Sequence, residues 1–271
     1  MRSNRPGQIL AALLAFSSAL TPAARAADLD RSHPPYDALL KRHAADGFAD
    51  YAGLKRDSKK LDAYLDALAA ISRSEFDVWG EPDRLAFLIN LYNAQTLRLI
   101  LDHYRKIDSI KDIGSLFKGP WDLKIVRLFG EKRTLNEIEH ETIRKLYKEP
   151  RAHFALVCAS IGCPPLRAEA YTGARLNEQL NDQGRRFLAQ AAKNHYAPAE
   201  KTLYLSPIFK WFEEDFTAKA GSVTTFVIPY LPDEAARHLL KDRANVRIRY
   251  TDYNWKLNDR PRREKSRTSG S

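Results

Sequence analysis

The stretch from Asp83 to His103 reads DRLAFLINLYNAQTLRLILDH, and it is apolar nearly all the way round when it is drawn as an α-helix. Pro82 suits the first turn of such a helix, and the Asp83 carboxylate favours its N-terminus. A helix that is apolar on every side belongs at the centre of a domain. The sequence therefore predicts a domain that is built around this segment.

Two amides interrupt this apolar pattern. Asn90 and Asn93 are three residues apart and share a face of the helix. Because buried amides need hydrogen-bond partners, these side chains either tie the helix to neighbouring loops or line a binding pocket. Both interpretations stay open at this point.

Helical spacing also governs most of the remaining chain. Thr134 and Glu137 have the form of a capping box at the start of a further helix. We expect helices at 36–43, 61–71, 135–147, 174–192, 208–220, 223–230 and 231–240, and strands at 121–129, 154–157 and 246–250. The predicted fold class is α+β, a helix-rich single domain over residues 27–255. Its small β-sheet is expected to carry the loop that contains Cys158 and Cys163, called the cysteine loop below.

The first 26 residues have the features of a cleavable signal peptide. Arg2 and Arg5 precede the apolar run Ile9–Leu20, and Ala24–Ala26 forms a small-x-small cleavage site. We expect a periplasmic or secreted protein whose mature chain begins near Ala27. No later segment reaches the roughly 18 consecutive apolar residues of a transmembrane helix, so no transmembrane segment is predicted.

The basic charge of the chain is concentrated at its ends. The formal net charge is +10; three arginines belong to the predicted signal peptide and a net +4 to residues 256–271, so residues 27–255 carry only +3. We predict that residues 256–271 form a basic disordered tail, solvated or in weak contact with an envelope or membrane surface. The body shows no basic stripe, which argues against a nucleic-acid partner.

Both cysteines of the chain lie in the stretch Arg151–Arg167, RAHFALVCASIGCPPLR. The apolar run 154–157 is expected to deliver Cys158 to a short loop, and Pro164 ends regular structure directly after Cys163. If the protein performs chemistry, this loop is where we expect it.

One interpretation makes Cys158 a nucleophile. A reactive thiolate needs a lowered pKa, a nearby base and a group that orients the base. His140 and His153 are the candidate bases, with Glu137, Glu139 or Asp215 as the group that orients the base. His153 is five residues before Cys158 and would face away from it in a regular strand, which favours His140. Ser160 and the backbone amides of residues 161–162 would supply an oxyanion pocket.

Other interpretations of the loop stay open. Two cysteines in an oxidising compartment favour a Cys158–Cys163 disulfide, structural or redox-active. Cys158, Cys163, His140 and His153 together would also suit zinc chemically, although their spacing matches no common zinc pattern. Free thiols in a non-catalytic binding module are the fourth possibility. No metal or other cofactor is predicted.

Several motifs of the chain resemble a known family. AFLINLYN (86–93), LNEIEH (135–140), the stretch 151–167, IFKWFEEDF (208–216) and YTDYNW (250–255) are similar to the family known as domain of unknown function 547. The resemblance extends over nearly the whole mature chain, with Leu88 and Thr134 where the family often has tryptophan and serine. It implies polar residues in fixed loops, which suggests a site, and it implies no particular substrate.

Together these observations predict an exported protein, either a thiol-dependent hydrolase or acyl transferase acting on peptide-like or cell-envelope substrates, or else a binding module or thiol-redox protein. The proposed catalytic residues are Cys158, His140, His153 and Asp215. The proposed binding residues are Asn90, Asn93, Glu139, Ser160, Cys163 and Arg167.

Overall fold

The computed structural model describes residues 29–115, 117–242 and 245–261. The predicted signal peptide lies outside the described residues, as do residues 262–271 of the predicted tail. The helices and strands of the first half are α1 (Pro34–His43), β1 (Ala44–Ala45), β2 (Phe48–Ala49), α2 (Tyr51–Arg56), α3 (Ser58–Ala69), α4 (Arg73–Asp77), α5 (Glu81–His103), η1 (Ile110–Asp112), η2 (Pro120–Asp122), β3 (Val126–Leu128) and β4 (Glu131–Arg133).

The second half begins with η3 (Glu137–Tyr147), which is a π-helix, and α6 (Ala152–Ala155). The remaining elements are η4 (Gly173–Arg175), α7 (Leu176–Leu188), β5 (His195–Ala197), η5 (Pro198–Glu200), β6 (Thr202–Leu205), α8 (Ile208–Trp211), α9 (Glu213–Ala220), α10 (Val223–Val227), η6 (Ile228–Tyr230), α11 (Asp233–Asp242) and β7 (Arg247–Tyr250). This helix-rich α+β architecture confirms the predicted fold class.

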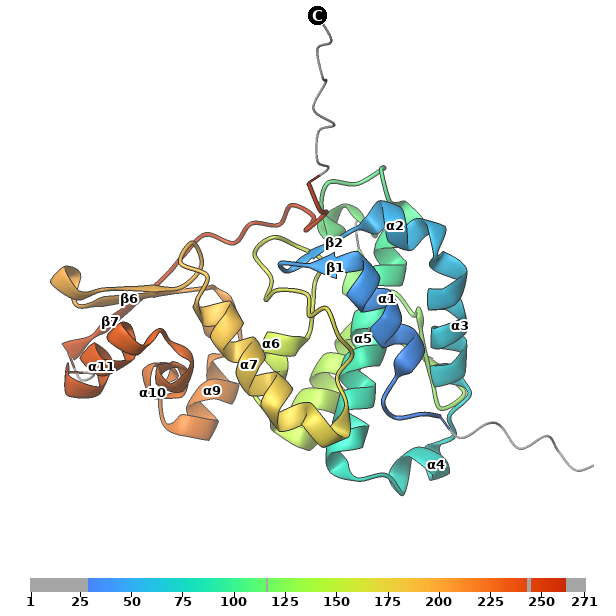
Figure 1. Cartoon of the computed structure of the whole chain (residues 1–271), viewed down its shortest axis with the longest axis horizontal. Helices are drawn as coiled ribbons and strands as arrows, with labels where there is room; N and C mark the ends of the chain where they lie inside the picture. The colour runs from blue at the N-terminus through green and yellow to red at the C-terminus, as the bar shows by residue number, and fades with distance from the viewer. Residues whose placement is uncertain (1–28, 116, 243–244, 262–271) are drawn as a thin grey trace, which may run out of the picture.

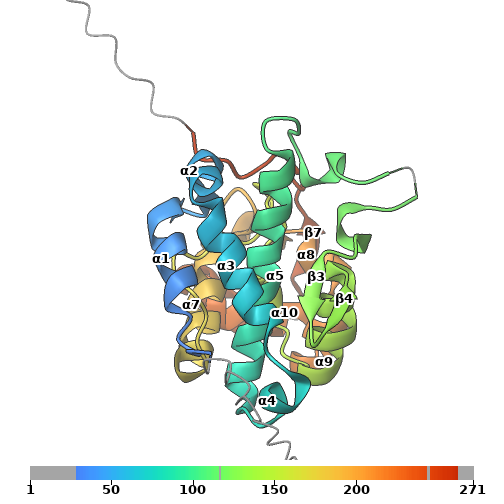
Figure 2. The same cartoon turned by 90° about the vertical axis from the view of Figure 1, so that its right-hand side faces the viewer.

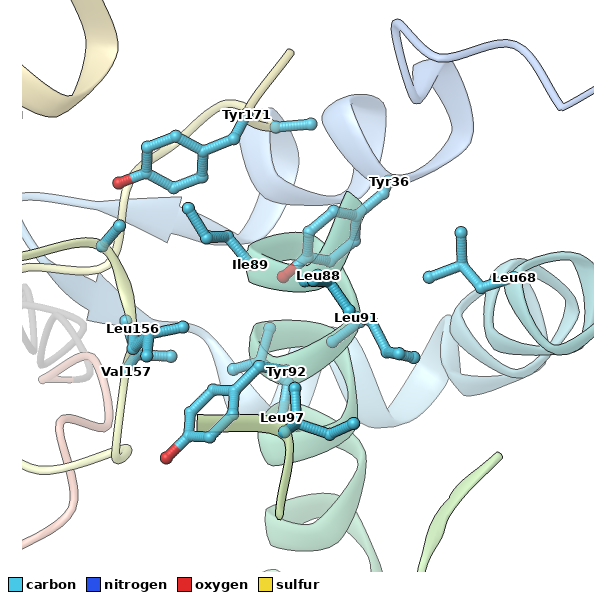
Figure 3. Packing of buried hydrophobic residues seen from close by; sticks show 14 of the residues in the cluster. Tyr36, Leu68, Leu88, Ile89, Leu91, Tyr92, Leu97, Leu156, Val157 and Tyr171 are labelled. Carbon is cyan, nitrogen blue, oxygen red and sulfur yellow. The ribbon is translucent and has the colours of Figure 1, made fainter. Parts of the chain in front are cut away.

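The central helix α5 organises the first half of the molecule. It begins next to Pro82 and packs against α3, while α1 packs on the other side of α3 (Figure 2). Fifteen of its residues, from Leu85 to Leu101, are buried. Figure 3 shows Leu88, Leu91 and Leu97 of this helix among the buried side chains of neighbouring elements, including Tyr36 of α1 and Leu68 of α3. The burial of α5 on all sides follows from its continuous apolar sequence.

A second apolar cluster joins α7 to α8, α9, α10 and β6. These elements lie on the other side of α7 from α5 in Figure 1. Phe154, Phe209 and Phe216 meet there with side chains of α10 and β6. The three-stranded sheet beside it pairs β5 antiparallel and β7 parallel with β6. Since Phe154 comes from α6, this short helix joins the second cluster to the cysteine loop.

The expected strand at 154–157 is wrong. Residues 152–155 form α6, and the chain becomes extended only at Leu156, so the cysteine loop follows a helix rather than a strand. In this helical turn the consecutive residues His153 and Phe154 both contact the ring of Phe216, whereas consecutive side chains of a strand would point to opposite faces. The expected strand at 121–129 shortens to β3, and the helix expected at 208–220 breaks at Phe212.

The segment that follows β7 runs back across the molecule to the first half (Figure 1). Residues 256–261, which the sequence analysis placed in the tail, are among those that pack there. Asn258 is buried, its backbone N–H donates to the Ala159 carbonyl, and its side chain accepts a hydrogen bond from the Tyr51 hydroxyl. The ordered body therefore continues past Trp255.

Candidate functional site

The cysteine loop is anchored on α5 by one of the two predicted amides. Asn93 donates from Nδ2 to the Ala155 carbonyl and accepts from the Val157 N–H, at 2.9 and 3.0 Å. Ala159 then adopts a left-handed conformation with φ of 56°, unusual for a residue with a side chain. Because such a conformation persists only where its surroundings enforce it, the loop holds Cys158 in one fixed place.

The segment that follows β7, residues 251–261, is called the closing segment here and fixes the other side of the loop. The N–H groups of Ile161 and Gly162 donate to the carbonyls of Lys256 and Asn254, both at 2.8 Å. A Cβ at Gly162 would lie 2.9 Å from the Asn254 nitrogen, so only glycine fits this approach. These bonds also correct a prediction, because both amides are already used and do not form an oxyanion pocket.

The Cys158 thiol meets two hydroxyl groups. Its Sγ lies 2.9 Å from the Tyr253 hydroxyl and 3.3 Å from the Ser160 hydroxyl, which itself donates to Tyr253. The Cys163 thiol, followed by these two hydroxyls, lowers the pKa of Cys158 and outweighs the opposite effect of burial. Cys158 is only partly buried, so this thiol combines access with thiolate character.

Cys163 is a contrasting second thiol. Its Sγ accepts the Cys158 N–H at 2.9 Å, its side chain is buried, and both cysteines are free thiols. Burial, and then the neighbouring Cys158, raise the pKa of Cys163 well above its ordinary value. The pair therefore combines one thiol whose pKa is lowered with one whose pKa is raised.

His153 forms an oriented pair with Asp215. The Nε2 atom of His153 lies 2.7 Å from Oδ2 of Asp215, and Arg144 binds both carboxylate oxygens, at 2.6 and 3.0 Å. Burial raises the pKa of Asp215, but the hydrogen bonds from His153 and Arg144 outweigh it and hold the pKa well below its ordinary value. The ring of Phe212 stacks on His153 with centroids 3.8 Å apart. These contacts fix the position and orientation of the imidazole.

Glu139 faces the other nitrogen of the same ring. Its Oε1 is 3.8 Å from Nδ1 of His153, and its Oε2 accepts a hydrogen bond from the Tyr92 hydroxyl at 3.0 Å. Among the described residues, Nδ1 of His153 has no hydrogen-bond partner. The π-helix η3 presents Glu139 here, and it starts with the predicted capping box between Thr134 and Glu137. Such helices recur at functional sites.

These side chains surround one cavity of about 220 Å³. Both thiols, His153, Glu139 and His140 line it. The cavity also has an aromatic wall, which consists of Tyr92, Trp121, Trp211, Phe212, Tyr253 and Trp255. The complete lining consists of Tyr92, Trp121, Asn136, Glu139, His140, His153, Leu156, Val157, Cys158, Cys163, Pro164, Ile208, Trp211, Phe212, Tyr253 and Trp255. The cavity therefore contains an ionisable thiol and an oriented imidazole within a mostly apolar enclosure.

The structure changes which histidine is the better candidate for the base. His140, favoured as the base, has its Nδ1 3.0 Å from Arg144, whereas His153 carries the carboxylate partner. His153 was expected to face away from Cys158 in a regular strand, but residues 152–155 form a helical turn and both side chains line the cavity. Ser160 lies beside Cys158 as expected, but it is a partner of the thiol and of Tyr253.

Asn90 serves a separate loop. It exchanges two hydrogen bonds with the backbone of Tyr171, at 2.7 and 3.0 Å, and does not line the cavity. Of the two interpretations of these amides, the tie to a loop holds for both Asn90 and Asn93.

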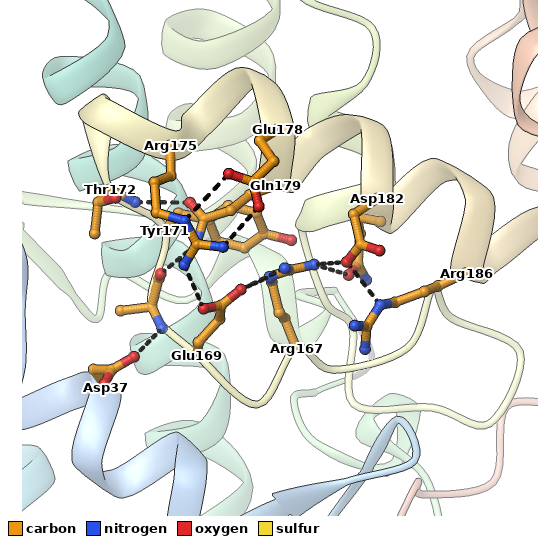
Figure 4. A network of polar contacts seen from close by, with 12 residues as sticks. Asp37, Arg167, Glu169, Tyr171, Thr172, Arg175, Glu178, Gln179, Asp182 and Arg186 are labelled. Atoms are coloured by element: carbon orange, nitrogen blue, oxygen red, sulfur yellow. Dashed lines mark hydrogen bonds and ion pairs between the residues drawn. The ribbon is translucent and has the colours of Figure 1, made fainter.

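Arg167 lies away from the cavity in a network of ion pairs (Figure 4). It is buried, and its guanidinium contacts Glu169 and Asp182, with Arg175 bound to the far oxygen of Glu169. All of its charge is used in fastening the loop after Pro165 to α7, so the structure corrects the binding role predicted for Arg167.

The sequence analysis missed most of the aromatic wall. Tyr253 and Trp255 lie in the YTDYNW motif and Tyr92 in AFLINLYN, so the family motifs held the signal without indicating which side chains meet. Trp211 is 48% exposed and lines the cavity. Among the described residues, no group of three or more His, Cys, Asp or Glu side chains is placed to hold a metal ion, and no helix is long and apolar enough to cross a bilayer.

Comparison with known proteins gives one family match. Residues 76–188 match the model described as "Protein of unknown function, DUF547". This range contains α5, η3 and the cysteine loop, but not Asp215 or Tyr253. No curated protein and no solved structure matches the chain.

Proposed function

The chain belongs to the family of proteins of unknown function DUF547, and we propose that it is a thiol-dependent hydrolase or acyl transferase. The single observation that carries this proposal is that the Cys158 thiol, whose pKa is lowered, shares a cavity with His153, which Asp215 orients. A nucleophile, a base and a group that orients the base are the parts needed for covalent acyl chemistry.

The roles follow from the contacts. The Cys158 thiolate attacks the carbonyl carbon of an ester or amide, and the bond from that carbon to the leaving group breaks. Since Nε2 of His153 is bound to Asp215, Nδ1 is the atom that takes the proton of the Cys158 thiol and then gives it to the departing group. Water or another acceptor then releases the acyl group from Cys158. Peptide-like or cell-envelope molecules are the substrates that we propose.

The test is acylation of the protein by p-nitrophenyl acetate. We expect a burst of one equivalent of p-nitrophenol and an acetyl group on Cys158 by peptide mass spectrometry. Cys158→Ala should abolish the burst and His153→Gln should slow it. The exposed His195→Gln is the matched control and should react like the wild type. An undiminished burst from Cys158→Ala would refute the proposal.

A second candidate function is thiol redox exchange. The observation that favours it is the pairing of a low-pKa, accessible Cys158 with a high-pKa, buried Cys163 in contact with its backbone. In this alternative, Cys158 attacks a disulfide of the substrate, and Cys163 resolves the mixed disulfide, leaving a Cys158–Cys163 bridge. Intact mass with and without alkylation separates the two, because only the redox protein should cycle between zero and two free thiols without unfolding. A binding module would show neither acylation nor cycling.

We also propose that the protein is exported to the periplasm or secreted, on the signal-peptide pattern of residues 1–26. Expression of the full chain in a Gram-negative host, followed by N-terminal sequencing, tests this. Export predicts a mature N-terminus at Ala27 in the periplasmic or extracellular fraction. A retained Met1 in the cytosolic fraction would overturn it.

A further inference from the structure

Two buried acceptors converge in the cavity without a donor between them. Asp215 is an ionised acceptor, so the Nε2 of His153 that lies 2.7 Å away carries a hydrogen. In the neutral ring, Nδ1 therefore presents a lone pair toward Oε1 of Glu139, 3.8 Å away. Within the described part of the chain, neither atom accepts a hydrogen bond. Two facing acceptors are stabilised by a group that donates to both.

The charge of the lining selects the donor. Among the residues that line the cavity, Glu139 is the only Asp, Glu, Lys or Arg, and its side chain is 11% exposed. Arg144 behind it is bound to Asp215. A cationic N–H donor suits a buried carboxylate better than a neutral or anionic group.

The aromatic wall suits the same ligand. Tyr253 lies 4.9 Å from Trp211 and 4.4 Å from Trp255 by ring centroids, and the partly exposed Trp211 lies at the edge of the cavity. The ammonium of Lys111 already sits 4.8 Å from the Trp255 ring, so a cation is tolerated on this surface. Adjacent aromatic rings of this kind can cover the methylene chain of an alkylamine while its charged end reaches inward.

We propose that the acyl acceptor is a primary alkylamine of the lysine side-chain type, whose nitrogen lies between Glu139 and His153. This deepens the proposed function and rests on it, since the amine attacks the thioester formed at Cys158. The ammonium gives one proton to His153 Nδ1, which is neutral after protonating the first leaving group. The free amine attacks the acyl carbon, the bond to Cys158 Sγ breaks to regenerate the thiolate, and the second surplus proton passes by way of Glu139 to solvent. The product is an amide.

The experiment follows the fate of the acetyl group from p-nitrophenyl acetate. The wild-type protein is mixed with n-butylamine, with Nα-acetyl-lysine methylamide or with glycinamide, and n-butanol is the uncharged control. We expect saturable formation of N-butylacetamide and of the Nε-acetyl-lysine derivative, in excess over the uncatalysed reaction, and no butyl ester. If glycinamide is acetylated with equal efficiency, the acyl acceptor is still an amine, and an α-amine is as good an acceptor as a lysine-type side-chain amine.

Variants test the placement of the nitrogen. Glu139→Gln should lower the ratio of amide to acetate by about tenfold, the loss expected for one charge-assisted hydrogen bond. Glu141→Gln is the matched control, because Glu141 is exposed on the same helix and paired with Lys145. Its ratio should equal that of the wild type. An unchanged ratio in Glu139→Gln would overturn the placement.

A binding measurement keeps the two proposals apart. Quenching of tryptophan fluorescence by n-butylammonium reports on the aromatic wall without any reaction, and we expect saturation in the wild type and weaker binding in Glu139→Gln. Acylation of Cys158 together with hydrolysis only and no amine binding would overturn this inference and leave the proposed function standing. Absence of acylation at Cys158 would overturn both.

Discussion

The Nε2 atom of His153 lies 2.7 Å from Oδ2 of Asp215, a carboxylate 62 positions further along the chain. We expect Asp215→Asn to reduce the acylation rate of Cys158 on the order of 10²–10⁴-fold, because the imidazole loses the group that fixes its tautomer. The rate of p-nitrophenol release under single-turnover conditions measures this. Circular dichroism of the same variant provides the control for folding, and a rate within twofold of the wild type would contradict the assigned role.

The lowered pKa of Asp215 predicts that its contribution to the free energy of unfolding depends on pH. The folded-state pKa of Asp215 is below its ordinary value of 3.8, so the ionised form stabilises the fold above that pH. Asp215→Asn should therefore lower the free energy of unfolding by about 1–3 kcal/mol at pH 7. The difference should shrink as the pH falls below 3.8, because the carboxyl group of the unfolded wild-type chain then takes up a proton before that of the folded protein. Urea unfolding of both proteins between pH 7 and pH 3 tests the sign, and a difference independent of pH would refute it.

Cys158 should react with iodoacetamide at a lower pH than an ordinary thiol, because its pKa is lowered by Cys163, Ser160 and Tyr253. Tyr253→Phe removes one donor to the sulfur and should shift the alkylation midpoint to higher pH. Mass spectrometry of the pH-dependent labelling gives the midpoint for each protein. The buried Cys163 should stay unlabelled until the protein is unfolded, and its labelling in the native state at a comparable rate would contradict the described asymmetry.

Asn93 and Asn90 form a matched pair of substitutions on one helix. Each makes two hydrogen bonds to a backbone segment, so Asn→Ala at either position should lower the free energy of unfolding by about 2–4 kcal/mol. Only Asn93 holds the residues directly before Cys158. We therefore expect Asn93→Ala, and not Asn90→Ala, to alter the pH profile of Cys158 alkylation; equal changes in both would show that the effect is global.

Arg167 should matter for stability and not for the chemistry. Its side chain is 7% exposed between Glu169 and Asp182, and Arg167→Ala should lower the free energy of unfolding by about 2–5 kcal/mol. Arg175, which is 48% exposed and binds the same Glu169, is the control and should cost less than about 1 kcal/mol. Thermal unfolding gives both values. Acylation of Cys158 per folded molecule should be unchanged in each variant, and a large loss in Arg167→Ala would restore a role in binding.

The local pattern of the chain determined the framework of the protein. The continuous apolar run of α5 requires burial on every side, and Pro82 with the acidic first turn determines where the helix begins. Thr134 and Glu137 cap η3 as their spacing predicts. The residue types and proline boundary of the loop were also enough to indicate the stretch around Cys158, which lines the cavity, since these signals lie within a few residues of one another.

Only the tertiary structure decided which side chains meet Cys158. His153 replaced His140 as the oriented imidazole because residues 152–155 form a helical turn that buries Phe154 in the second cluster, an outcome of packing with distant helices. Tyr253 reaches the thiol from 95 positions away because the closing segment crosses the molecule and bonds to Gly162. Contacts at such separations depend on the whole core, and no local periodicity encodes them.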